Sequence, residues 1–190
     1  GKAFEGIFAD AFEGVDIVVT AESDFTFGEG AYMDEATFNA IGDVEGVDAI
    51  FPFIQAFGIA PLDADGEPLG GQGPPQLGAN LVEGDTSGFV IREGDYPVGP
   101  DEIALDAGTA EANEFAIGDT VAVITPTSPP RDYTLVGVAG FGEEDNLGGS
   151  TWVFFDLPTA QAVMERPGVV SGGSVQVVGG ADVDQVIERI

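Results

Sequence analysis

The chain has 190 residues, of which 34 are aspartate or glutamate and five are lysine or arginine, so its formal net charge at pH 7 is −29. A surface with this charge repels phosphate backbones and anionic lipid head groups, which argues against nucleic-acid binding. Histidine and cysteine are absent, which excludes Ser-His-Asp and Cys-His catalysis and nearly all types of zinc site.

The N-terminal part of the chain predicts two helices and the strands beside them. Apolar residues recur at helical spacing over residues 3–12, and the β-branched residues in 15–20 predict a strand. Asp34 is expected to begin the second helix and Gly46 to end it. Residues 47–62 then predict one bent strand, or two strands that break at the proline. The longest apolar run lies in this stretch and is too short to span a bilayer, so any membrane-spanning part is expected outside this sequence.

Residues 63–67 (DADGE) allow two interpretations. Their carboxylates suggest a calcium loop, but an EF-hand requires glycine at its sixth position and glutamate at its twelfth, where this chain has Pro68 and Pro74. A hairpin turn built on Asp65 and Gly66 is therefore favoured.

The stretch 99–124 organises the strand-rich middle of the chain. It predicts a short strand followed by an alanine-rich helix, which Asp106 is expected to cap by accepting hydrogen bonds from the free amides of its first turn. A tight turn at residues 117–119 then leads to a second strand at 120–124.

The C-terminal part returns to an alternation of strand and helix. Residues 152–155 predict a strand, after which Asp156 is expected to cap a helix that has Pro158 in its first turn. Another strand is expected at 174–178. Asp182 then begins a last helix as part of a capping box, and the apolar residues of this helix recur on one face.

Together these elements predict an α+β fold with a real core, since hydrophobic residues make up 44% of the chain. The two outer segments each supply strand, helix and strand, and the β-rich middle separates them. Two such halves pair into one antiparallel sheet with helices on one face. We therefore predict a split ferredoxin-like subdomain formed by both chain ends, with a smaller β-rich subdomain inserted between them.

The organising stretch, GPDEIALDAGTAEANEFAIGDTVAVI, also carries a resemblance. It is similar to a segment in the extracytoplasmic domains of FtsX-like ABC transporter permeases, known as the MacB-like periplasmic core domain. The similarity continues through three further segments, which are 133–139 (YTLVGVA), 141–149 (FGEEDNLGG) and 151–164 (TWVFFDLPTAQAVM).

The resemblance implies how the chain divides. Residues 1–88 and 142–190 would form a porter-like α+β subdomain, and residues 89–141 would form the inserted β-rich subdomain. Both chain ends would then lie at the same end of the molecule, each as a helix directed toward the membrane.

The resemblance also implies a function. Such domains lie on the extracellular or periplasmic side of the cell membrane, and their permeases pair with a second copy and with a cytoplasmic ATP-binding subunit through their membrane parts. The domain itself would be non-catalytic and would need no cofactor. It would couple ATP-driven helix movement to export, release or partner activation outside the membrane, and the terminal helices would transmit the motion. The isolated domain is expected to be monomeric.

Two other classes of function are open to the sequence. An enzyme would depend on a pair of carboxylates, but nothing selects a pair among the 34 acids. A free exported acidic binding module is the stronger alternative, because one loop gathers oxygen ligands and glycines in a composition that suits calcium or a partner. That loop contains Glu143, Glu144, Asp145, Asn146 and Leu147.

The acidity has two interpretations of its own. The acids are spread along the chain, which is typical of a solvated acidic surface and not of an acidic tail. Such a surface fits a salt-adapted organism, where molar salt screens the repulsion over short distances, or an ordinary acidic exported domain.

Overall fold

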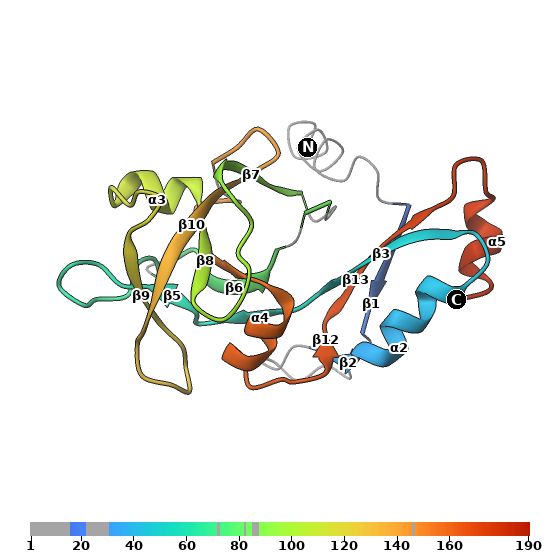
Figure 1. The fold of residues 1–190 in the computed structure, drawn as a ribbon, viewed down its shortest axis with the longest axis horizontal. Helices are drawn as coiled ribbons and strands as arrows, with labels where there is room; N and C mark the ends of the chain where they lie inside the picture. Colours follow the sequence, from blue (N-terminus) through green and yellow to red (C-terminus); the bar gives the residue numbers. More distant parts are fainter. Residues whose placement is uncertain (1–15, 22–30, 72, 82, 85–87, 146) are drawn as a thin grey trace.

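The computed structural model describes residues 16–21, 31–71, 73–81, 83–84, 88–145 and 147–190. Within these residues the strands form a small sheet of three strands, a large sheet of eight strands and a separate two-stranded pair (Figure 1). This mixture of sheets and helices confirms the predicted α+β class. The helix expected at residues 3–12 lies outside the described residues. In the described part of the chain, no helix is both long and apolar enough to cross a membrane.

The small sheet, the separate two-stranded pair and the helices beside them come from segments far apart in the sequence. They are β1 (Ile17–Thr20), β2 (Met33–Asp34), α2 (Glu35–Asn39), the 3-10 helix η1 (Ala40–Asp43), β3 (Val47–Phe53), β12 (Val169–Val170), β13 (Gly172–Val177) and α5 (Val183–Ile187). β13 lies at the centre and pairs antiparallel with β1 on one side and β3 on the other, so β1 and β3 run in the same direction. With α2 between them in the chain, they form a split β-α-β unit. The complete split ferredoxin-like arrangement stays a prediction.

One face of the small sheet is covered by α2 and η1. Phe38 and Ile41 are buried there in an apolar cluster with residues of β1, β3 and β13. Gly173 in β13 permits this packing, because an added Cβ would lie 2.4 Å from the Phe38 ring and 2.2 Å from the Phe51 carbonyl oxygen. The opposite face is more open, since Val18 of β1 is 61% exposed.

The large sheet curls onto itself. Its strands are β4 (Gln55–Phe57), β5 (Ala60–Pro61), β6 (Gln76–Asn80), β7 (Phe89–Gly94), β8 (Glu102–Asp106), β9 (Thr120–Ile124), β10 (Arg131–Phe141) and β11 (Thr151–Phe155), accompanied by helices α3 (Ala107–Ala112) and α4 (Leu157–Val163). The hydrogen-bonded order is β4-β6-β11-β8-β10-β9-β5, and β7 also pairs with β10. β4 and β5 stand at opposite ends of this order, yet only residues 58–59 separate them. The sheet must therefore bend round to bring its two edges together.

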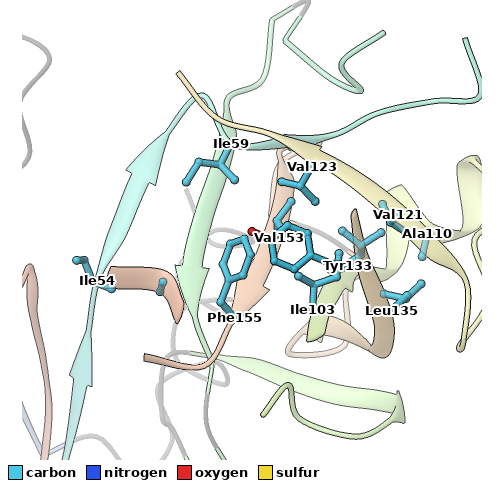
Figure 2. Close-up of a cluster of buried hydrophobic side chains, with 12 residues drawn as sticks. Ile54, Ile59, Ile103, Ala110, Val121, Val123, Tyr133, Leu135, Val153 and Phe155 are labelled. Atoms are coloured by element: carbon cyan, nitrogen blue, oxygen red, sulfur yellow. The ribbon is translucent and has the colours of Figure 1, made fainter. Parts of the chain in front are cut away.

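The main core lies inside the curled sheet (Figure 2). Val153 and Phe155 of β11 belong to this core, whereas Trp152 and Phe154 lie in a second apolar cluster. There the ring of Phe89 lies 4.9 Å from Trp152 and 4.7 Å from Phe154, measured between ring centroids. Burial on both faces explains the continuous apolar sequence of β11. The other large side chains of the main core are Ile54, Ile59, Ile103, Leu105, Val121, Val123, Tyr133 and Leu135.

The sequence allowed a strand break at Pro52, but the break lies two residues later, at Ile54. β3 passes through Pro52 and ends at Phe53, and the chain changes sheet at Ile54. Proline is tolerated inside β3 because β3 is an edge strand of the small sheet, where a residue without an amide N–H costs no ladder hydrogen bond.

The large sheet takes strands from both sides of the boundaries expected at 88/89 and 141/142, and the division into two subdomains stays a prediction. β11 pairs with β6, and both come from segments assigned to the porter-like subdomain. However, β11 also pairs with β8, which comes from the predicted insertion. One continuous sheet therefore spans residues 55–155, and the small sheet takes its strands from residues 17–53 and 172–177. Composition along the chain does not encode these long-range pairings.

Candidate functional site

The loop that the sequence singled out connects β10 to β11 and begins with a tight turn. The amide of Phe141 donates to the carbonyl oxygen of Glu144 at 2.8 Å, and the amide of Glu144 donates to the carbonyl oxygen of Phe141 at 2.9 Å. The side chains of Glu143, Glu144 and Asp145 are exposed. Leu147 is half-buried and packs on the cluster that contains Phe141, so it anchors the loop to the sheet. Asn146 lies outside the described residues.

Arg92 of β7 holds this loop from the neighbouring strand. Its guanidinium forms an ion pair with the carboxylate of Asp145 and donates to the carbonyl oxygens of Glu144, at 2.6 Å, and Gly142, at 3.2 Å. Gly140 leaves room for the side chain, because an added Cβ there would lie 2.0 Å from the Arg92 Nε. The loop was a candidate cation site because it is rich in oxygen ligands. Three of its oxygens instead bind the guanidinium of Arg92.

No metal centre is assembled by the residues that the structure describes, since they contain no group of three or more His, Cys, Asp or Glu side chains able to hold an ion. The earlier acidic stretch, residues 63–67, forms a turn as expected. The Oδ1 atom of Asp63 accepts from the amides of Asp65 and Glu67, each at 2.9 Å.

Asp106 is a carboxylate buried between α3 and β11. Its Oδ1 accepts from the amide of Thr109, which caps α3 as predicted, and its Oδ2 accepts from the amide of Trp152, both at 2.8 Å. Burial raises the pKa of Asp106 above its ordinary value, and the hydrogen bonds from Trp152 and Thr109 oppose that shift. Both oxygens are engaged by backbone amides, so the carboxylate joins α3 to β11.

A shallow cavity of about 360 Å³ lies beside this junction. Its lining contains no charged side chain and includes Gly70, Gly108, Thr109, Asn113, Gly149 and Thr151. The cavity is therefore neutral in a protein whose net charge is −29.

The start of β1 and the end of β13 lie side by side at one end of the small sheet. The amide of Val177, at the end of β13, donates to the Oδ2 of Asp16, just before β1, at 2.8 Å. The chain therefore enters β1 and leaves β13 at neighbouring positions.

The last helix, α5, is fastened to the turn that precedes β3. Val186 is 1% exposed and lies against Gly46, where an added Cβ would be 2.7 Å from the Val186 side chain. The amide of Val178 donates to the Gly46 carbonyl oxygen at 2.9 Å, and the Arg189 guanidinium donates to the Glu45 carbonyl oxygen at 3.0 Å. Ile187 is 50% exposed. Of the apolar face predicted for this helix, Val186 is the part that is fully buried.

The family comparison agrees with this architecture. The model of the MacB-like periplasmic core domain matches residues 1–190. The chain belongs to this family. It is thus a periplasmic or extracellular domain of an ABC transporter permease, as the resemblance in residues 99–124 implied.

Two solved structures share the fold of this periplasmic core domain. The periplasmic region of MacB from Actinobacillus actinomycetemcomitans superposes with a TM-score of 0.64 at 11% identity, covering 93% of this chain and 82% of that one. The extracellular domain of the noncanonic ABC-type transporter YknZ from Gram-positive bacteria gives a TM-score of 0.61 at 14% identity, covering 90% and 87%. None of the curated protein sequences matches the chain.

The structural role of Arg92 in this periplasmic core domain was not predicted from the sequence. Its partners Gly142, Glu144 and Asp145 are 50 to 53 residues away in the chain. The scarcity of cations was the available signal, because a few positive charges among 34 acids are expected to be paired. Arg131 also pairs with an acid, Asp101.

Proposed function

We propose that this domain transmits motion without catalysing a reaction. A cytoplasmic subunit binds ATP and moves the membrane helices of two permease copies, and the domain carries that movement to an export, release or activation event outside the membrane. The partners in this proposal are the ATP-binding subunit and the second permease copy, both reached through the membrane parts.

The observation that carries the proposal is that the chain enters β1 and leaves β13 at neighbouring positions. Asp16 and Val177 are hydrogen bonded. Forces that reach the domain through the segment before β1 and the segment after β13 therefore act on one end of the small sheet. α5 is the described element closest in sequence to the second connection, and Val186 and Arg189 fasten it to residues 45–46. Those residues lead directly into β3, so a displacement of α5 acts on the small sheet.

The interior of the domain suits this role. Packed cores move as units and shift between discrete arrangements, because close packing resists continuous deformation. Phe38, buried beneath α2, and Phe155, buried in the curled sheet, are both 0% exposed.

The test compares two neighbouring residues of α5 in the full permease assembled with its ATP-binding subunit. Val186→Ser removes the buried contact with Gly46, whereas Ile187→Ser alters a side chain that is 50% exposed. A spin label is placed at Asp132, an exposed residue of β10, in both permease copies, and the distance between copies is measured without nucleotide and with trapped ATP.

The unsubstituted permease and the Ile187→Ser variant should show the same ATP-dependent change in distance. Val186→Ser should reduce that change while ATP hydrolysis continues, because α5 loses the buried contact that fastens it to the turn before β3. A full ATP-dependent change in Val186→Ser, or no change in the unsubstituted permease, would contradict the proposal.

A further inference from the structure

The chain passes from the small sheet to the large sheet at a single residue. β3 ends at Phe53 and β4 begins at Gln55, so Ile54 is the step between them, and its side chain is 0% exposed. Figure 1 shows β3 leaving the small sheet and running across the molecule toward the large one. Phe53 is the last residue of β3 paired with β13, and Gln55 is the first residue of β4 paired with β6. The ladder hydrogen bonds therefore change partner strands at Ile54.

Asn80, the last residue of β6, spans this step. Its side-chain Oδ1 accepts from the amide of Ile54 at 2.8 Å, and its Nδ2 donates to the carbonyl oxygen of Pro52 at 2.9 Å. Its backbone amide also donates to the carbonyl oxygen of Ile54 at 3.3 Å. Asn80 is 1% exposed, so these hydrogen bonds are shielded from water.

The side chain at this position must both donate and accept. A carboxamide has one oxygen acceptor and two N–H donors, whereas ionised aspartate lacks the donor and leucine lacks both. The two hydrogen bonds hold Pro52 and Ile54, the residues on either side of Phe53. The side chain of Asn80 thus extends the hydrogen bonding of β6 past the point where β4 begins and onto the last residues of β3.

Ser171, the residue before β13, also binds the chain on both sides of Ile54. The amide of Ser171 donates to the carbonyl oxygen of Phe53 at 2.8 Å, and the Ser171 hydroxyl accepts from the amide of Gln55 at 3.4 Å. The other route between the sheets, residues 156–171, is longer and passes through α4 and β12. The step at Ile54 is therefore the shorter of the two connections between the sheets.

We propose that Asn80 is a positioning residue that fixes the angle between the small and the large sheet, so that a displacement of the small sheet carries the large sheet with it. The claim that a displacement passes from the small sheet to the large sheet rests on the proposed function. The claim that Asn80 fixes the angle between the sheets concerns the chain alone and can be tested without a transporter.

The test uses the 190-residue chain with one spin label in each sheet. The chain contains no cysteine, so Asp48→Cys in β3 and Asp132→Cys in β10 give two unique labelling sites, both exposed. The distance distribution between the labels is measured by pulsed electron paramagnetic resonance, and the melting temperature is recorded for each variant.

The central variants are Asn80→Asp, which loses the donor to Pro52, and Asn80→Leu, which loses both side-chain hydrogen bonds. Val123→Ala is the matched control, because it removes buried volume from the large sheet at a residue that is 1% exposed and lies outside this junction. It lowers stability without touching the step between the sheets.

The unsubstituted chain should give one narrow distance peak, and Val123→Ala should keep that peak although its melting temperature falls. Asn80→Asp and Asn80→Leu should lose the narrow peak, either by broadening or by a shift. If the Asn80 variants melt earlier but keep the peak, Asn80 is merely structural and the inference fails. A broad distribution in the unsubstituted chain would also overturn it. Neither result depends on ATP, so the proposed function is tested separately.

Discussion

Removing the guanidinium of Arg92 should release the loop between β10 and β11. The substitution Arg92→Met keeps the apolar stem of the side chain and deletes the ion pair to Asp145 and the two hydrogen bonds to carbonyl oxygens of the loop. Because the two charged side chains of the pair are 32% and 58% exposed, that pair contributes at most about 1 kcal/mol. Each carbonyl hydrogen bond contributes about 0.5–1 kcal/mol.

These contributions add up to about 2 kcal/mol of unfolding free energy, which for a chain of this length corresponds to a fall in melting temperature of about 4–8 °C. Arg131→Met is the matched control, since Arg131 also forms one ion pair, to Asp101, but the two side chains are 52% and 77% exposed. That change should cost less than about 1 kcal/mol.

Two assays check the expectation. Thermal unfolding gives the stability of both variants. Hydrogen exchange reports the protection of the Glu144 and Phe141 amides, each of which donates to the carbonyl oxygen of the other residue across the turn. Arg92→Met should lose protection at these amides while the protection of β11 is kept. The reasoning is refuted if Arg92→Met is no less stable than Arg131→Met and the turn amides exchange at the unsubstituted rate.

Three further predictions concern pH, salt and packing. Burial raises the pKa of Asp106 in the folded chain above its ordinary value of 3.8, so between that value and the folded pKa the folded state binds more protons. Stability should then fall as pH rises through this window, and urea unfolding of Asp106→Asn should show a smaller dependence on pH there. Raising NaCl from about 0.1 M to about 1 M should raise the melting temperature, because screening weakens repulsion within a chain of net charge −29, and an unchanged value would contradict this. Gly173→Ala should cost at least about 3 kcal/mol in urea unfolding, since its Cβ would meet the Phe51 carbonyl oxygen at 2.2 Å, whereas Gly179→Ala has open space and should change stability by less than about 0.5 kcal/mol.

The local part of the fold could be predicted from the sequence. Asp106, Asp156 and Asp182 were expected to begin helices, and each accepts a hydrogen bond from an amide two or three residues further on. A cap depends on a few neighbouring residues, so its signal is contained in a short stretch.

The long-range hydrogen bonds of two of these side chains could not be predicted. The second oxygen of Asp106 accepts from Trp152, 46 residues away, and that of Asp156 accepts from the amide of Gly99, 57 residues away. Such contacts exist only once the strands are paired, and their order depends on which strands share a sheet. The same limit applies to Asn80 and to the placement of β11 between β6 and β8.

The exposed face of α5 shows a different limit. Periodicity correctly indicated that Val186 and Ile187 belong to a helix, but it cannot say how much of an apolar stripe the rest of the chain covers. Val186 is 1% exposed because Gly46 lies beneath it, whereas Ile187 is 50% exposed.

The central claim is that the domain moves as one body when the membrane helices move. The most direct measurement uses the full permease with its ATP-binding subunit in lipid nanodiscs and compares two distances, with and without trapped ATP. One is the distance between the Asp132 positions of the two copies, and the other is the distance between Asp48 and Asp132 within one copy. The account predicts that ATP changes the first distance and leaves the second unchanged. A change confined to the second distance would contradict it, because the two sheets would then move relative to each other and would not transmit the motion.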